Sequence, residues 1–205
     1  MKSIITLFTL LLALLSVNAQ DKIGISFAQN FSTLRFLDSD DNKEDLDFAI
    51  KYGYGLSYQL GFHESFFVEG NLFYNTKGAN STLDLQKLDW SMHYINASIN
   101  GGYRFNLRRL VPHFGVGVYY GRLMNADQFI GSDYYDLMST DAIGKNDLGA
   151  NLFAGLEYEY SEVGAVFIRF TESMGLLNLE NDEETTQKMF NRTFSIQLGL
   201  NFNIN

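Results

Sequence analysis

Large apolar side chains alternate with small or polar ones along most of the chain. Between Tyr52 and Phe62, every even position is Tyr, Leu or Phe, and every odd position is Gly, Ser or Gln. A period of two is typical of a β-strand with two unlike faces. The same alternation recurs along the chain and predicts eight strands, over residues 22–36, 48–62, 66–78, 93–105, 111–121, 147–160, 165–173 and 192–205.

Short and long connections alternate between these predicted strands. The short connections are residues 63–65, 106–110 and 161–164, and the long ones are the polar stretches 37–47, 79–92, 122–146 and 178–189. Outer-membrane barrels show this asymmetry, with short periplasmic turns and long extracellular loops. The pattern therefore predicts an all-β fold: an eight-stranded antiparallel up-and-down transmembrane β-barrel with both termini on the side of the short turns.

The composition of the polar face separates two kinds of barrel. A soluble barrel of the lipocalin type, which is the alternative, would carry many Lys and Glu residues on its water-facing surface. Here the polar face is mainly Gly, Ser, Asn, Thr and Gln, which suits the crowded interior of a narrow membrane barrel. The apolar face is then expected to meet lipid. Two interfacial aromatic girdles are expected from Phe48, Tyr52, Phe62, Phe66, Tyr74, Phe105, Tyr120, Tyr160 and Phe202.

The first 19 residues have the pattern of a signal peptide. Lys2 precedes an apolar run from Ile4 to Leu15, and Val17 and Ala19 fit the small-residue cleavage rule. We therefore expect residues 1–19 to be removed and residues 20–205 to form one exported barrel domain. The alternative is an uncleaved anchor, but the run is short against the roughly 20 apolar residues that a bilayer needs.

Charge and cysteine content exclude several classes of protein. The net charge of −9 argues against nucleic acid as a partner, because phosphate neutralisation needs a basic surface. The absence of cysteine excludes disulfides, thiolate metal sites, a cysteine nucleophile and a lipoprotein anchor. The only proline is Pro112, which suits a chain made mostly of strands.

Several segments resemble the PorT-like outer-membrane β-barrel domain family of the Bacteroidota. They are "FYNTKGAN" with its Tyr-x-x-Lys-Gly pattern, "HYINASINGGYRF", "VPHFGVGVYYGRL", "NDLGANLFAGLEY", "AVFIRFTESMGLLNL" and "SIQLGLNFNIN". Together they cover most of the chain after the predicted signal peptide, in the family's order. One departure is Asn96-Ala97, where family members often have Ile-Pro.

The resemblance implies an eight-stranded barrel in the outer membrane. The founding member of the family is an accessory of type IX protein secretion. We do not carry that specific role over to a general relative. A link to protein secretion is therefore a hypothesis to be tested.

The three histidines are the first candidates for catalysis. His63 lies in a predicted tight turn, where adjacent residues cannot form a triad. His93 has Ser91 and Asp89 nearby in sequence, but a polar loop rim explains all three. His113 is expected to face the lumen as a hydrogen-bonding residue. We therefore predict no catalytic residue, no cofactor and no enzymatic activity.

The acidic stretch from Asp38 to Asp47 resembles a calcium loop only in part. Asp38, Asp40 and Asn42 match the first ligand positions of an EF-hand, but Lys43 stands where glycine is required and Ala49 where glutamate is required. We therefore predict no specific metal site. Looser cation bridging to lipopolysaccharide is left open for this loop and for a second one with Glu180, Asp182, Glu183 and Glu184.

Charged residues of both signs are predicted to face the lumen. Their balance predicts internal ion pairs, since an unpaired buried charge is very costly. The alternative is a gated ion path, although the side chains of an eight-stranded barrel just fill its interior. The expected ion-pair network consists of Lys51, Glu69, Lys77, Arg104, Glu157, Glu159 and Arg169.

These features predict a small, plugged outer-membrane barrel with a structural, interaction or accessory role in the cell envelope. Its expected contacts are outer-membrane lipid, lipopolysaccharide and a protein of an envelope or secretion complex, and the barrel is expected to be monomeric. The alternative is an outer-membrane transporter or small pore, or a surface lipid- or peptide-hydrolase.

Overall fold

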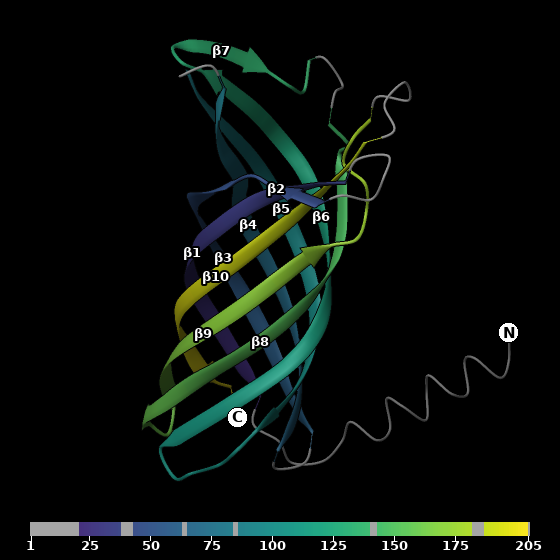
Figure 1. Ribbon diagram of the computed structural model, residues 1–205. Coiled ribbons are helices and arrows are strands. Elements are labelled where there is room, and N and C mark those ends of the chain that lie inside the picture. Colours follow the sequence, from purple (N-terminus) through teal and green to yellow (C-terminus); the bar gives the residue numbers. More distant parts are fainter. Residues whose placement is uncertain are drawn as a thin grey trace, which may run out of the picture.

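Eight long strands form a closed antiparallel ring in the computed structural model, which describes residues 21–37, 43–62, 65–83, 86–139, 143–181 and 187–204 (Figure 1). Neighbouring strands pair in chain order, and β10 returns to pair with β1 from Lys22↔Asn203 to Leu37↔Lys188. The predicted eight-stranded up-and-down barrel is therefore confirmed. Its strands are β1 (Lys22–Leu37), β3 (Asp47–Phe62), β4 (Phe66–Leu83), β5 (Gln86–Arg104), β6 (Leu110–Ile130), β8 (Asn146–Ser161), β9 (Gly164–Gly175) and β10 (Lys188–Asn203).

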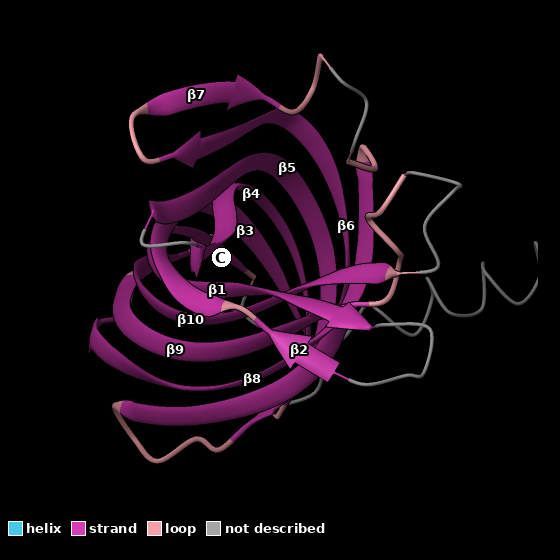
Figure 2. Cartoon of the chain, turned by 45° about the horizontal axis from the view of Figure 1, so that its top comes forward, coloured by secondary structure: helices cyan, strands magenta, loops and turns pink. Residues whose placement is uncertain are grey.

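Two short strands lie outside the ring. β2 (Lys43–Asp45) pairs with the end of β1, and β7 (Asp133–Asp136) pairs with the end of β6. Figure 2 tilts this end toward the viewer and shows the two strands on different sides of the ring. We assign it to the extracellular side, because the short turns lie at the other end. Within the described ranges, no helix is long and apolar enough to cross a membrane.

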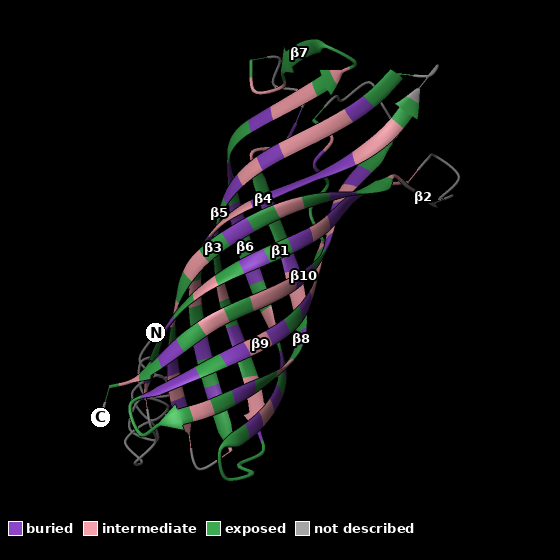
Figure 3. Cartoon of the chain, turned by 90° about the vertical axis from the view of Figure 1, so that its left-hand side faces the viewer, coloured by how far each residue is buried: buried purple, intermediate pink, exposed green. Residues whose placement is uncertain are grey.

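Exposed and buried residues alternate along the strands (Figure 3). Many of the exposed side chains are large and apolar. Leu56 is 57% exposed and Val116 is 62% exposed, whereas Gly53 and Gln59 are buried. A protein surrounded by water would bury such apolar side chains, so an outer wall that exposes them on every strand suits hydrocarbon. The two faces lie as the alternation predicts.

Aromatic side chains gather at both ends of the apolar wall. At the periplasmic end, the ring centroids of Phe66 and Tyr103 are 5.1 Å apart. Toward the extracellular end, those of Tyr54 and Tyr74 are 5.4 Å apart. Aromatic rings at both limits of an apolar band are typical of membrane barrels.

β4, β5 and β6 continue well past their predicted ends. Residues 79–83 pair with 86–90, and β6 runs to Ile130 before Gly131, with a φ of 63°, turns the chain into β7. The prediction of long loops over residues 79–92 and 122–146 is therefore wrong for most of these residues. Their alternation is reversed in polarity, with Leu88 buried inside and Lys87 exposed outside. We call residues 79–83, 86–92, 123–130 and β7 the extracellular extension.

The mouth of the barrel inside this extension is filled by apolar side chains. Gly144 N donates to Leu179 O and Leu179 N donates to Met189 O, each at 2.8 Å, so the connections pack onto the strands. The buried side chains resemble the core of a soluble protein. We call this cluster the apolar cap; it consists of Leu34, Ala79, Met92, Tyr94, Leu123, Ala126, Ile143, Leu179 and Met189.

Candidate functional site

A bidentate ion pair crosses the middle of the lumen. Arg169 Nη1 lies 2.6 Å from Glu69 Oε1, and Arg169 Nη2 lies 2.8 Å from Glu69 Oε2. Their strands, β9 and β4, are four apart in the ring of eight, so the pair joins opposite walls. Asn71 and Asn100 also donate to Glu69 Oε1, at 3.0 and 3.3 Å. The carboxylate is thus both paired and hydrogen-bonded, which a buried charge requires.

A second charged layer lies nearer the periplasm. Buried Lys22 forms an ion pair with Glu157 and lies 3.4 Å from Glu159 Oε1. Asn201 donates to the other oxygen of Glu157. Arg104 is buried close by, and its Nε has no hydrogen-bond partner among the described residues.

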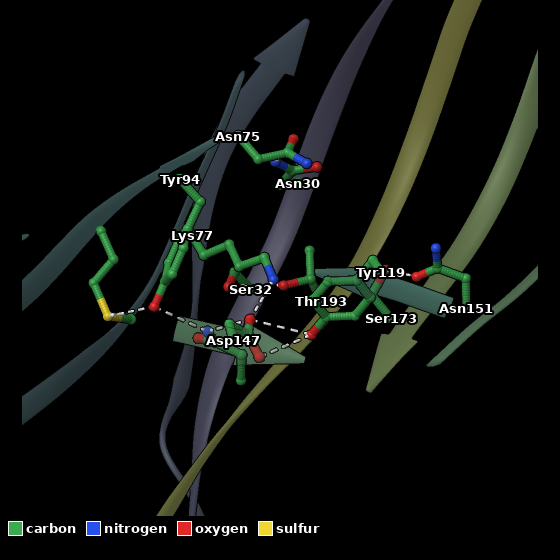
Figure 4. A network of polar contacts seen from close by, with 12 residues as sticks. Asn30, Ser32, Asn75, Lys77, Tyr94, Tyr119, Asp147, Asn151, Ser173 and Thr193 are labelled. Carbon is green, nitrogen blue, oxygen red and sulfur yellow. Dashed lines mark hydrogen bonds and ion pairs between the residues drawn. The ribbon is translucent and has the colours of Figure 1, made fainter. Parts of the chain in front are cut away.

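A third layer lies beneath the apolar cap (Figure 4). Lys77 Nζ lies 2.8 Å from Asp147 Oδ2, and Asp147 is fully buried. Tyr119 Oη donates to Asp147 Oδ2 at 3.1 Å, and Asn191 Nδ2 donates to the same oxygen at 2.9 Å. Lys77 Nζ also lies 4.4 Å from the centre of the Tyr119 ring, a distance that suits a cation–π contact. This layer ties β4, β6, β8 and β10 together.

Lys51 lies outside these layers. Its Nζ is 2.7 Å from Asp89 Oδ1 and 2.6 Å from Ser91 Oγ. The Asp89 side chain is 42% exposed, so this pair lies near the rim and not in the lumen interior.

The segment from Tyr74 to Gly78 carries the Tyr-x-x-Lys-Gly pattern, and β4 departs from regular pairing with β3 in its last three residues. The register of the two strands shifts between Phe48 and Gly53. Side chains of β1 reach the backbone of β4 instead, because Asn30 Nδ2 donates to Thr76 O at 3.0 Å and Ser32 Oγ accepts from Gly78 N at 3.1 Å. A Cβ at Gly78 would lie 1.8 Å from Trp90 O. We call residues 74–78 the pinch; it places Lys77 over Asp147.

The seven predicted lumen charges form one pair among themselves, between Glu69 and Arg169, in the part of the chain that the structure describes. Their other ion pairs use partners that the prediction omitted, namely Lys22, Asp89 and Asp147. Lys22 and Asp147 lie at the first and second positions of their strands, respectively. Each is two positions before a glycine that the alternation places inside. Counting in steps of two from Gly24 and Gly149 would have placed both inside.

The interior that remains is small and polar. A cavity of about 50 Å³ lies between the Arg169 and Lys77 layers, and its wall is rich in Asn, Ser and Thr side chains. A second cavity, of about 10 Å³, lies beside Arg104 and Glu157. The first has room for a few water molecules.

The sequence places this architecture in a family. The model of the outer membrane protein β-barrel domain matches residues 7–202, which is nearly the whole chain. The chain belongs to this family. It is accordingly a small outer-membrane β-barrel protein. The comparison with curated proteins finds no match.

Several solved outer-membrane barrels are similar in fold. A major outer membrane protein from Thermus thermophilus is 11% identical, with 91% of this chain and 100% of that chain covered and a TM-score of 0.55. Neisserial surface protein A is 14% identical (91% and 100% covered, TM-score 0.52), and Ail of Yersinia pestis is 13% identical (92% and 100% covered, TM-score 0.51). At these identities the likeness shows the fold alone.

The histidines of this family member occupy different surroundings. His63 lies outside the described residues. His93 Nδ1 is 2.9 Å from Tyr74 Oη and 3.2 Å from Thr76 Oγ1. His113 is buried beside Arg169, whose Nε donates to His113 Nε2 at 3.3 Å. The hydrogen bonds of His93 go to Tyr74 and Thr76. The structure therefore does not bring His93 together with Ser91 and Asp89 as a catalytic group.

The structure describes only part of the two acidic stretches. Asp38, Asp40 and Asn42 lie outside the described residues, as do Asp182, Glu183 and Glu184. In the ranges that are described, no group of three or more His, Asp or Glu side chains could hold a metal ion. The expectation about loose cation bridging therefore stays a prediction.

Proposed function

We propose that this protein is a non-conducting barrel whose rigid wall holds the extracellular extension above the membrane as an interaction surface. The observation that carries the proposal is the Arg169–Glu69 pair, which joins opposite walls of the lumen. Removing one partner of such a pair would leave a buried charge uncompensated, so the pair resists opening. The Lys77–Asp147 layer and the apolar cap block the lumen at two further levels.

The extension offers the kind of surface that protein partners use. Phe129, Tyr134 and Tyr135 are 42%, 57% and 47% exposed, although this part of the wall rises above the apolar band. Tyr134 Oη donates to Asp127 Oδ1 at 2.6 Å, and this hydrogen bond raises the pKa of the phenol. Tyrosines with an apolar body and a polar tip are common at interfaces.

Site-specific photocrosslinking in intact cells tests this role. We expect a crosslinker at Tyr135 to give a discrete protein adduct, and the same crosslinker at lipid-facing Val116 to give none. A lack of discrete adducts from Tyr134, Tyr135 and Phe129 alike would contradict an interaction role for the extension.

The finer assignments belong to the same proposal. We infer membership of the PorT-like group from the Tyr74–Gly78 pattern, and this supports an accessory role in the envelope, with protein secretion as the process to test first. We also propose that the barrel is monomeric and has no enzymatic activity. Lipopolysaccharide is its proposed lipid partner.

We further propose that residues 1–19 are a cleaved signal peptide and that residues 20–205 are the mature domain. Mass spectrometry of the N-terminal peptide of protein purified from outer membranes would then show a chain that starts at Gln20. A start at Met1 would contradict cleavage.

A further inference from the structure

The turn that joins β5 to β6 presents two arginines at the periplasmic end of the barrel, the end opposite β7 (Figure 1). Leu107 N donates to Leu110 O at 3.0 Å, and Leu110 N donates to Leu107 O at 3.1 Å. These hydrogen bonds close a two-residue turn whose central residues are Arg108 and Arg109. All residues from Phe105 to Leu110 are exposed. The backbone of the turn is therefore fixed, and both arginines lie on the surface.

Arg108 has a backbone conformation that favours glycine. Its φ is 57°, and no other residue except glycine has a positive φ in the described ranges. When the first central residue of a two-residue hairpin turn has a positive φ, glycine is typical there, because a Cβ is strained in this region. The chain thus carries a long cationic side chain where glycine would relieve strain. Strain of this kind favours a functional role for the side chain.

Neither guanidinium group of this turn forms a hydrogen bond or an ion pair with the part of the chain that the structure describes. Glu159 N donates to Arg109 O at 2.8 Å, but Glu159 Oε1 lies 3.4 Å from Lys22 Nζ. The acidic side chain that follows this turn across the sheet is therefore directed to another cation. The turn over residues 161–164, at the same end of the barrel, carries Glu162 and no basic residue. The two arginines are thus a local, uncompensated pair of positive charges in an acidic chain.

Apolar side chains flank the turn and continue into the lipid-facing wall. The ring centroid of Tyr103 is 5.0 Å from that of Phe105 and 6.1 Å from that of Phe114. Beyond this aromatic cluster, Leu107 is 62% exposed and Leu110 is 45% exposed, directly beside the arginines. Aromatic rings mark the edge of the apolar band, and long cationic side chains beyond them reach the headgroups. The turn therefore lies at the level of the phospholipid headgroups of the periplasmic leaflet.

We propose that this turn binds the phosphate of an anionic phospholipid of the periplasmic leaflet. Arg108 and Arg109 would donate to the phosphate oxygens, since guanidinium groups bind phosphate through paired hydrogen bonds. Leu107 and Leu110 would pack on the first carbons of the acyl chains. Apolar side chains beside the charges, at the edge of a lipid-facing wall, favour a lipid over an acidic protein. The inference concerns the leaflet opposite lipopolysaccharide and does not rest on the proposed role of the extracellular extension.

Native mass spectrometry of the detergent-solubilised protein, purified from outer membranes, tests the site with dioleoylphosphatidylglycerol as the probe. We expect Arg108→Gly/Arg109→Ser to weaken binding about tenfold or more, because hydrogen bonds to a charged group are lost. Lys87→Ser/Arg122→Ser is the matched control, since it removes two exposed cations from the extracellular end. It should bind the lipid as the unmodified protein does. Glycine suits the φ of residue 108, so the test variant should keep the heat-modifiable gel mobility of a folded barrel.

Two further arms identify the ligand. Dioleoylglycerol, which has the same acyl chains and no phosphate, should bind the unmodified protein as weakly as the phospholipid binds the test variant. Glycerol 3-phosphate, which has the anion without the chains, should not displace the phospholipid. Equal binding of the phospholipid to the unmodified protein and the test variant would overturn the proposal. Displacement by glycerol 3-phosphate, or a discrete protein adduct from a photocrosslinker at Arg109 in intact cells, would overturn the lipid assignment.

Discussion

The membrane-spanning wall and the extracellular extension are built from the same strands but have opposite polarity. Within the membrane, Glu69 and Arg169 are buried inside while Val116 is exposed outside. In the extension, Met92 and Leu123 are buried inside while the outer positions are largely polar. β5 and β6 run through both regions, so strand identity does not determine which face is apolar. The surrounding medium does: hydrocarbon favours a polar interior, and water favours an apolar one.

Removing a charged side chain from the lumen should lower the stability of the protein more than any other change considered below. Arg169→Ala leaves Glu69 buried without its partner, and we expect it to lower the free energy of unfolding by about 3–5 kcal/mol. Urea titration of the barrel in lipid vesicles measures this. The double variant Arg169→Met/Glu69→Leu should recover most of the loss, and a double variant as unstable as the single one would contradict the pairing.

Two methionines compare the interior of the extension with its outer surface. Met92 is fully buried in the apolar cap, whereas Met124 is 53% exposed on β6. We expect Met92→Ala to lower the free energy of unfolding by about 2–5 kcal/mol. Met124→Ala should change it by no more than about 0.5 kcal/mol. Equal costs in the same urea titration would mean that the apolar cap does not act as a core.

Introduced charges compare the outer surfaces of the two regions. Val116→Lys places an ammonium against hydrocarbon and should cost about 2–4 kcal/mol. Tyr135→Lys, on β7, should change stability by about 0.5 kcal/mol or less, since this side chain faces water. Similar folding yields and unfolding midpoints for both variants would place the apolar band elsewhere.

Two glycines of β4 test the pinch, and the expected change in the free energy of unfolding is smaller than for the introduced charges. A Cβ at Gly78 would meet Trp90 O at 1.8 Å, whereas a Cβ at Gly70 has no atom within 4 Å. Gly78→Ala should cost about 1–3 kcal/mol through overpacking. Gly70→Ala should be neutral or stabilise by up to about 1 kcal/mol. A tolerated Gly78→Ala would show that the close approach of β4 and β5 is not required.

The sequence predicts the fold within the membrane well, because lipid on one side and a crowded lumen on the other produce clear alternation from Tyr52 to Phe62. It predicts the extension poorly, since Gln86–Met92 has the polar outer face that loops also have. In the candidate site, the inward direction of Glu69 and Arg169 follows from alternation alone. Their pairing depends on the strand order around the ring, which joins residues 100 positions apart. The partners Lys22 and Asp147 were missed because they lie at strand ends.

Conductance of the purified, refolded protein in planar lipid bilayers tests whether the lumen is closed. The charged layers and the apolar cap predict an electrically silent membrane, with no steady channel at either polarity. Insertion can be verified by heat-modifiable mobility of protein recovered from the same preparation. A steady, reproducible single-channel current from folded protein would contradict the closed barrel and favour a pore.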